Sequence, residues 1–369
     1  MGTWGEIGQE IKDAKADPAV GAAALDHVRR KYLALLHEHT GRATVLYATK
    51  WTQPGGSQPI SGEFISITNE DVHGFMEALH GLETDRLDLI LHSPGGSAEA
   101  AEAIVTYLRS KFDNIRVIVP HMAKSAATMI ACAADEIVMG KHSFLGPIDP
   151  QFVLNTSLGP RMVPAQAIIE QFEKAKEDCK DPNMVRAWLP MLSQYGPELL
   201  VSCQNASDLG EELVREWLAR YMFRTDRKRK SKARAIAKWL STHSHFKSHA
   251  RSISRDDLQD KGLNITALEA DQDAQGLILS VFHATSHTFN LTGAVKIIEN
   301  HLGKAYLKML QEVIVQQVPA QPAQPVKPSK ERQPAKRRSG SAKKKAKSKE
   351  TAKPKKSAAT KIVKSKPSA

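Results

Sequence analysis

Cysteine is scarce in this chain of 369 residues, which contains only Cys132, Cys179 and Cys203. The three cysteines lack the close pairing found in zinc sites, and their odd number argues against a disulfide framework. Such a composition is typical of a protein kept in a reducing compartment. We therefore expect a protein without a metal centre or a cofactor.

Long apolar runs are also missing. A helix that spans a membrane needs about 20 consecutive apolar residues, and the chain has no uncharged apolar run of comparable length. Residues 1–17 show no basic segment followed by an apolar run, which is the pattern of a secretory signal. We predict a cytoplasmic protein that has no membrane partner.

Positive charge is concentrated near the C-terminus. Residues from Lys327 onward include 17 lysines and arginines but only Glu331 and Glu350, which leaves 35 basic and 38 acidic residues in the rest of the chain. Large apolar residues almost disappear after about Gln316, so we predict that residues 316–369 are disordered. Such a tail suits electrostatic binding of DNA or RNA of any sequence, whereas its lack of aromatic residues gives no support to base stacking.

Two strand-turn-helix units follow each other in the middle of the chain. In the first, the apolar residues 87–91 lead into the turn 93–96, and an alanine-rich helix begins near Ser97. In the second, residues 115–119 form the strand and a helix begins near Ser125, with a third strand after it. This spacing is that of crossover units between parallel strands, so we expect both turns at one edge of an α/β sheet.

These two turns suggest a chemistry. The Gly95-Gly96 turn exposes backbone N–H groups that could hold a developing oxyanion. Ser125, at the start of the neighbouring helix, is a candidate nucleophile. A simpler alternative is that the glycines only make a tight connection and that the serine only caps its helix.

Four segments in this region together resemble a known family. They are His92-Ser93-Pro94-Gly95-Gly96, Lys124-Ser125-Ala126-Ala127-Thr128, Ala133-Ala134-Asp135-Glu136-Ile137-Val138-Met139-Gly140 and Leu145-Gly146-Pro147-Ile148-Asp149-Pro150-Gln151. Their order and spacing resemble the Clp-protease/crotonase superfamily and, within it, the serine dehydrogenase proteinases, relatives of signal peptide peptidase A. A fainter likeness extends from about Arg29 to Leu263.

The resemblance implies an α/β fold with a ClpP/crotonase-like core of repeated ββα units, a helical elaboration and the disordered basic tail. We divide the chain accordingly into an N-terminal helical segment (1–40), the catalytic core (41–155), the helical elaboration (156–240), the C-terminal part of the folded body (241–315) and the tail (316–369). The resemblance also implies a homo-oligomer.

The activity implied by the resemblance is hydrolysis of peptide bonds in peptide or protein substrates. Carried over to this sequence, it makes Ser125 the nucleophile and the amides of Gly95, Gly96 and Ala126 the oxyanion hole. Ala127 stands where such peptidases often have glycine. Two other functions stay open, namely a crotonase-type acyl-CoA enzyme and a catalytically silent oligomeric scaffold tethered to nucleic acid.

The proton acceptor for the serine is less clear. The segment that carries the Clp histidine corresponds here to residues 143–151, which contain no histidine, and His142 and Lys141 are weak substitutes. Signal peptide peptidases use a lysine further along the chain, which favours Lys174 first and Lys176 second. Each of these two lysines is equally well explained as an exposed partner of a neighbouring glutamate.

The region after residue 151 reads mainly as helical, with helices expected over 165–178, 183–192 and 196–238, no strand until about Leu263, and two helical segments between 274 and 312.

His243, His245 and His249 invite a metal interpretation, but no acidic ligand or cysteine accompanies them, so we expect no metal site. In the family that this chain resembles, a histidine-bearing segment followed by a Gly-Leu strand is a recurrent structural feature. His249, followed by Gly262-Leu263, is similar to it. The basic residues 224–234 are expected to be a solvated face rather than a binding site.

Overall fold

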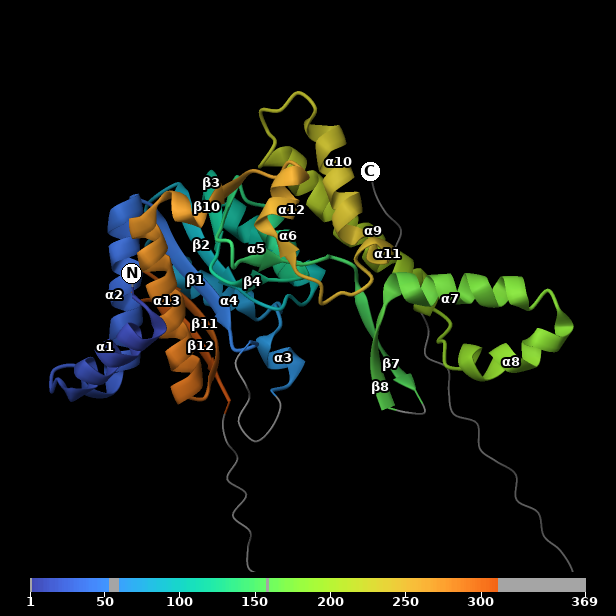
Figure 1. Ribbon diagram of the computed structural model, residues 1–369, viewed down its shortest axis with the longest axis horizontal. Helices are drawn as coiled ribbons and strands as arrows, with labels where there is room; N and C mark the ends of the chain where they lie inside the picture. Colours follow the sequence, from blue (N-terminus) through green and yellow to red (C-terminus); the bar gives the residue numbers. More distant parts are fainter. Residues whose placement is uncertain (1, 53–59, 157–158, 311–369) are drawn as a thin grey trace, which may run out of the picture. The chain divides into compact units, whose positions relative to one another are not determined.

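A seven-stranded mixed sheet lies at the centre of the computed structural model, which describes residues 2–52, 60–156 and 159–310 (Figure 1). The strand order is β10-β5-β3-β2-β1-β11-β12. The strands are β1 (Ala43–Thr49), β2 (Arg86–His92), β3 (Asn114–Val119), β5 (Glu136–Met139), β10 (Ile265–Ala267), β11 (Ala294–Asn300) and β12 (Ala305–Met309). The five strands from β10 to β1 are parallel, and β11 and β12 are antiparallel to their neighbours.

Helices cover both faces of this sheet, as its strand residues require. Residues of β1 and β2 alternate between two hydrophobic clusters, with Val45 and Leu89 in one and Leu46 and Ile90 in the other. The first cluster packs on α4 (Asp71–Leu79), α5 (Ala98–Arg109), α6 (Ala126–Cys132), α9 (Leu199–Arg220), α10 (Arg229–Ser241) and α12 (Arg255–Asp260). The second packs on α2 (Ala24–Thr40) and α13 (Gln272–Leu291), and α1 (Trp4–Ala16) contacts these two helices.

The predicted strand-turn-helix units are present in this sheet. Helix α5 connects β2 to β3, and helix α6 connects the turn after β3, which contains Ser125, to β5. All these strands run parallel, so the turns after β2 and β3 leave the same edge of the sheet. The α/β fold class and its helical additions are confirmed, whereas the predicted domain boundaries stay predictions and residues 316–369 lie outside the described residues.

The prediction of two helices between 274 and 312 is wrong in its second half. Helix α13 is followed by strands β11 and β12. Strand β11 has the sequence AVKIIEN, and its polar residues Lys296, Glu299 and Asn300 are all buried. The ammonium of Lys296 donates to Asp71, and Glu299 accepts from Arg29 at 2.5 Å. Pairing inside the protein allows these charges to be buried in a strand. They interrupt the apolar pattern by which sequence analysis finds buried strands.

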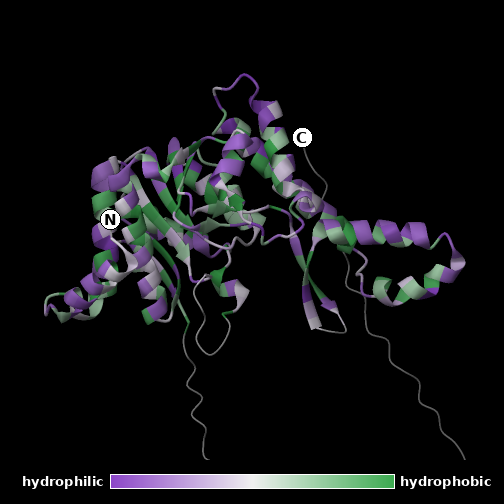
Figure 2. Ribbon diagram, in the orientation of Figure 1, coloured by the Kyte–Doolittle hydropathy of each residue, from purple (hydrophilic) through white to green (hydrophobic). Residues whose placement is uncertain are grey.

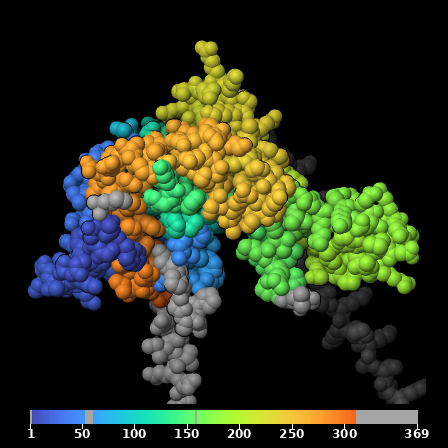
Figure 3. Space-filling view, viewed as in Figure 1, coloured from blue at the N-terminus to red at the C-terminus, as the bar shows by residue number. Residues whose placement is uncertain are grey.

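The prediction that no strand occurs between residue 151 and about Leu263 is also wrong. Strands β7 (Gln151–Thr156) and β8 (Gly159–Pro164) form an antiparallel hairpin, followed by α7 (Ala165–Asp178) and α8 (Pro182–Leu192). The described residues of β7 and β8 include none that is fully buried, and Phe152, Leu154 and Val163 form a partly buried apolar face that packs on α7 and α9. Such short, half-exposed strands leave a weak apolar pattern in the sequence. The predicted helix over 196–238 is two helices, α9 and α10. The hairpin and the helices α7 and α8 form an arm, drawn in green in Figures 1 and 3.

A second, small sheet has consequences for the site. Strand β4 (Met122–Ala123) pairs with β6 (Phe144–Leu145), and β6 pairs with β9 (Ile253–Ser254). The remaining short helices are α3 (Gly62–Ile65), α11 (His243–Phe246) and two 3₁₀ turns, Gly21–Ala23 and Leu268–Ala270. The small sheet brings together three segments that are more than 100 residues apart at their extremes, and each strand is within a few residues of a residue of the site described next.

Candidate active site

Ser125 occupies a sharp turn between β4 and α6. Its backbone has φ 50° and ψ −122°, a conformation that non-glycine residues rarely adopt and that costs about 1–3 kcal/mol. The side chain makes no capping hydrogen bond to α6, whereas Ser97 caps α5 by accepting from the Ala100 amide at 3.0 Å. The interpretation of Ser125 as a mere helix cap therefore does not fit the geometry, and its hydroxyl is left for another use.

The Gly95-Gly96 turn lies directly against this serine. Gly95 has φ 98°, and a Cβ atom at this residue would come within 2.6 Å of the Ser125 Cβ atom. A Cβ atom at Gly96 would come within 2.3 Å of the Ile67 carbonyl oxygen. Both positions therefore require glycine because of the close approach of neighbouring atoms.

The amides predicted as oxyanion donors differ in their present partners. The Gly95 amide donates to the Ser93 hydroxyl at 3.2 Å, so it is engaged within the turn. Among the described residues, the amides of Gly96 and Ala126 have no acceptor. The free pair Gly96 and Ala126 thus suits an oxyanion better than Gly95 does.

A buried carboxylate is shared by two histidines in this region. Asp149, 2% exposed, accepts a hydrogen bond from Nδ1 of His249 on Oδ1 at 2.8 Å and from Nδ1 of His243 on Oδ2 at 2.7 Å. Gln151 adds a third donor to the same carboxylate, at 3.0 Å. Since the carboxylate fixes Nδ1 of each ring as the bonded nitrogen, Nε2 of each ring is the nitrogen available for chemistry.

The small sheet assembles these groups. Its strand β4 precedes Ser125, β6 precedes Asp149, and β9 follows His249. Lys124 adds a tie, because its ammonium donates to the carbonyl oxygens of Leu145 and Arg251 and to the Ser252 hydroxyl at 3.0 to 3.1 Å. Burial lowers the pKa of Lys124 to about 8. The residue next to the serine thus holds the segment that carries His249.

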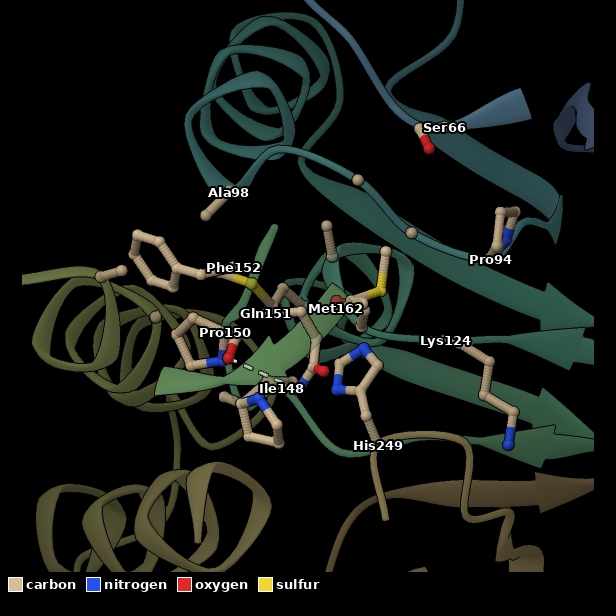
Figure 4. Close-up of a pocket in the computed structure, with 18 of the residues that line it drawn as sticks. Ser66, Pro94, Ala98, Lys124, Ile148, Pro150, Gln151, Phe152, Met162 and His249 are labelled. Carbon is tan, nitrogen blue, oxygen red and sulfur yellow. Dashed lines mark hydrogen bonds between the residues drawn. The ribbon is translucent and has the colours of Figure 1, made fainter. Parts of the chain in front are cut away.

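One pocket of about 1000 Å³ joins the groups (Figure 4). Its lining includes Ser125, Gly96, Ala126, His243 and His249. Apolar side chains supply much of the remaining wall, among them Met129, Ile148, Phe152 and Met162. Figure 4 shows the His249 ring projecting from its loop into this pocket. A serine, a carboxylate-bound histidine and two free amides therefore meet at one cavity.

The lysines and the histidine that were predicted as bases lie elsewhere. Lys174 is exposed on α7 and is not among the residues lining the pocket. Lys176 is exposed and pairs with Glu173 at 2.7 Å, which is the alternative weighed for it. Lys141 and His142 are exposed beyond β5, and neither lines the pocket. The structure does not bring any of these four predicted bases together with Ser125.

The residues that sequence analysis missed are Asp149 and the role of His249. Asp149 stands in one of the family-like segments and His249 in the histidine-rich stretch, so both carried a signal. The two are 100 residues apart, and only the pairing of β6 with β9 shows that they meet.

In the described part of the chain, no group of three or more potential ligands is arranged to hold a metal ion. No helix there is long and apolar enough to cross a membrane.

Comparison with known proteins agrees with the resemblance. The chain is similar to two uncharacterized proteins of Methanocaldococcus jannaschii, MJ1495 and MJ0137. The first is 30% identical over 200 residues, which cover 54% of this chain and 59% of the relative. The second is 40% identical over 116 residues, or 31% of this chain and 38% of the relative. The chain thus spans well under two thirds of the length of either relative.

A solved structure, a mutant of the 1510-N membrane-bound stomatin-specific protease, matches 54% of this chain and 74% of its own, at 15% identity and a TM-score of 0.32. A likeness this distant carries no weight for the fold or the function. The family model of ClpP-like SDH-type serine proteinases matches residues 59–192, which include Ser125 and Asp149 but not His249. The resemblance inferred from the sequence is confirmed: residues 59–192 carry the pattern of the ClpP-like SDH-type serine proteinase family.

Proposed function

We propose that this protein is a serine peptidase in which Ser125 is the nucleophile, His249 the general base and Asp149 the carboxylate that orients the histidine. The observation that carries the proposal is the shared pocket, where a strained, uncapped serine and a histidine bonded through Nδ1 to a buried aspartate both line the wall. A serine, a base and an orienting third group are the parts that acyl transfer needs.

The reaction follows from this arrangement. Ser125 Oγ attacks the carbonyl carbon of the peptide bond while His249 Nε2 accepts the hydroxyl proton. Asp149 stabilises the resulting imidazolium through the bond to Nδ1. The carbonyl oxygen becomes an oxyanion, for which the amides of Gly96 and Ala126 are the free donors. Collapse of the intermediate breaks the C–N bond, and the departing amine takes the proton from His249. Water then attacks the acyl ester by the same route.

His249 is preferred to His243 because of how its segment is held. Lys124, adjacent to Ser125, donates hydrogen bonds to the backbone carbonyl of Arg251 and to the hydroxyl of Ser252. These residues are only two and three positions after His249. His243 begins α11, and its own amide donates to Gln166 of α7, on the arm side of the pocket. Both contacts support His249 as the ring closer to the serine turn and His243 as a second support of Asp149.

His249 is also preferred to the lysine bases. A lysine acts as a base only when it can lose its proton, which requires burial or a neighbouring cation. Lys174 is exposed on α7 and does not line the pocket that contains Ser125. Lys124 is buried, but three acceptors already hold its ammonium. We therefore propose the triad with His249 in place of the predicted Ser-Lys mechanism with Lys174.

The pocket wall indicates the substrate class. Its apolar side chains come from α6, the β6–β7 connection and the hairpin β7–β8, and they suit peptide or protein substrates with an apolar residue near the cleaved bond. We also propose that the chain forms homo-oligomers, because the arm exposes the apolar residues Val153, Met162 and Leu189. Binding of nucleic acid by the tail concerns residues outside the described part and stays a prediction.

The experiment that tests the peptidase proposal compares the full-length chain with Ser125→Ala on a library of fluorogenic peptides. We expect cleavage by the parent protein and loss of at least about 10³-fold in kcat by the variant. Ser97→Ala is the matched control, since this serine caps α5 and should affect stability but not chemistry. Full activity of Ser125→Ala would refute the proposal.

A further inference from the structure

A second groove, distinct from the peptidase pocket, lies between α9 and α10. It has a volume of about 1060 Å³, in the range of pockets that hold ligands. Its lining contains six basic residues, Arg215, Arg220, Arg229, Lys230, Arg234 and Lys238, and one acidic residue, Glu216. The chain up to residue 326 has more acidic than basic residues, so this excess of five positive charges is a local concentration.

Few of these cations have an acidic partner in the described part of the chain. Arg215 pairs with Glu212 at 3.1 Å and Lys238 with Glu211 at 3.6 Å. Within the described residues, Arg220, Arg229, Lys230 and Arg234 form no ion pair with a carboxylate. Like charges held close together are unfavourable without a counterion. The groove is therefore built to receive an anionic partner that the described part of the chain does not supply.

The cations are arranged in a row. Lys230, Arg234 and Lys238 recur every four residues of α10, so they follow one side of the helix at intervals of about 6 Å. The opposite side of α10 is buried through Ala233, Ile236 and related residues. Figure 1 shows α9 and α10 next to each other, and in Figure 2 hydrophilic residues are prominent around the loop that joins them. A linear anion fits such a row better than a single compact ion.

The groove and the peptidase pocket both take lining residues from α9. On α9, Gly210 lines the pocket and Arg215 lines the groove. In the segment that runs from α10 into α11, Lys238 lines the groove and His243 lines the pocket. Five residues of helix correspond to about 7.5 Å, whereas an extended peptide advances about 3.3 Å per residue. Along the axis of α9 the lining residues of the two cavities are thus separated by the length of two or three residues of an extended chain.

We infer that the α9–α10 groove is an exosite for acidic segments of polypeptide substrates, which it holds while the neighbouring residues enter the pocket at Ser125. This inference rests on the proposed peptidase function and adds a substrate class to it. The partner is a polypeptide rather than a single-stranded nucleic acid because no aromatic residue lines the groove for base stacking. The lysine-rich residues 327–369 have the same sign of charge as the groove and do not complement it.

The test uses two fluorogenic peptides with the same cleaved sequence, one of which carries a run of aspartates and glutamates several residues from the cleaved bond. We expect a higher kcat/KM for the acidic peptide with the full-length protein. The double substitution Lys230→Glu and Arg234→Glu should lower kcat/KM for that peptide by about tenfold, mainly through KM, and leave the neutral peptide unchanged. Raising the salt concentration should reduce the same preference.

The matched control reverses two exposed lysines of α1, with Lys12→Glu and Lys15→Glu, which gives the same change in net charge away from the groove. This control should keep the preference for the acidic peptide. Equal kcat/KM values for both peptides in the parent protein would overturn the inference. So would a preference that survives Lys230→Glu and Arg234→Glu, since other cations, such as those of the tail, would then be responsible.

A binding measurement separates this inference from the peptidase proposal. Fluorescence anisotropy of a labelled acidic peptide on Ser125→Ala reports the groove without any catalysis. We expect binding that the Lys230→Glu and Arg234→Glu substitutions weaken about tenfold, even if no peptide is ever cleaved. If these substitutions abolish binding of labelled DNA but do not affect the acidic peptide, the groove is a nucleic-acid site and the inference is wrong.

Discussion

Asp149 and His249 are joined by a hydrogen bond of 2.8 Å between Oδ1 and Nδ1, although 100 residues separate them in the sequence. The same carboxylate holds His243 through Oδ2. The bond exists because β6, just before Asp149, pairs with β9, just after His249. A sheet of three two-residue strands thus fixes the geometry on which the proposed catalysis depends.

The first prediction concerns which residue is the base. His249→Ala should reduce kcat by at least about 10²-fold, because the serine loses its proton acceptor. His243→Ala should cost much less, since His249 still bonds to Asp149. Steady-state kinetics on one fluorogenic peptide measures both variants, with circular dichroism as the check on folding.

Lys174→Ala provides the opposing test. This exposed lysine was the first choice of sequence analysis, and our proposal gives its replacement no effect on kcat. If Lys174→Ala lost activity while His249→Ala kept it, the Ser-Lys mechanism would be right and the triad wrong.

The contrast between these residues shows what the sequence could predict. The motifs around Ser125 and Gly96 are local, so strand, turn and helix could be recognised within a few residues of each other. Asp149 and His249 meet through a long-range pairing of very short strands, which leave no periodic pattern. The proposed nucleophile could therefore be chosen from one segment, whereas its proposed partners required the tertiary structure.

The fold shows the same division. The parallel strands β2 and β3 each contain a buried apolar run and were predicted close to their observed bounds. Strand β11 was taken for helix because it contains Lys296 and Glu299, whose charges are compensated by Asp71 and Arg29 far away in the sequence. Strands whose polar residues find distant partners cannot be recognised from local composition.

The second prediction concerns the contact between Gly95 and Ser125. Gly95→Ala would place Cβ 2.6 Å from both the Ser125 Cβ atom and the Lys124 carbonyl oxygen, in a backbone conformation with φ 98°. We expect a loss of about 1–3 kcal/mol in the free energy of unfolding and a displaced serine turn with strongly reduced kcat. Urea denaturation and peptide kinetics measure the two effects.

Gly5→Ala is the control for this substitution. Gly5 lies in helix α1, and no atom lies within 4 Å of the position that its Cβ would take. The stability of this variant should equal or exceed that of the parent protein. A Gly95→Ala protein as stable and active as Gly5→Ala would show that the turn can accommodate a Cβ atom at residue 95, which would contradict the prediction.

The third prediction concerns acid stability. Burial, with a smaller effect of the nearby His121, lowers the pKa of His92 from 6.5 to about 3. The folded state therefore binds this proton less readily than the unfolded state, so stability falls as the pH drops from 6.5 towards 3. His92 bonds the Met122 carbonyl oxygen at the start of the serine turn, so the same protonation should disturb the site.

Urea denaturation at pH 7 and pH 4.5 tests this sign. His92→Asn should lose less stability between the two pH values than the parent protein does, because it removes the buried group that titrates. His27→Asn, at an exposed position of α2, should behave like the parent protein. Identical losses for His92→Asn and the parent would mean that His92 does not contribute to acid unfolding.

The fourth prediction concerns assembly through the arm. Light scattering of the full-length protein should give a mass that is a multiple of 40.6 kDa. Leu189→Glu, which places a charge on an exposed apolar residue of α8, should shift the mass towards the monomer. Leu302→Glu is the matched control, since Leu302 is equally exposed in the β11–β12 turn. A parent protein of 40.6 kDa at working concentration would contradict the prediction.

The central claim is that Ser125 is an activated nucleophile, and covalent labelling by a fluorophosphonate tests it most directly. The probe forms a stable phosphorus–oxygen bond with a serine that a neighbouring base deprotonates. The account predicts one adduct per chain, located on Ser125 by peptide mass spectrometry and formed much more slowly in His249→Ala. An unlabelled protein that turns over acyl thioesters instead would contradict the account and favour a crotonase-type enzyme, and an adduct on another serine would place the site elsewhere.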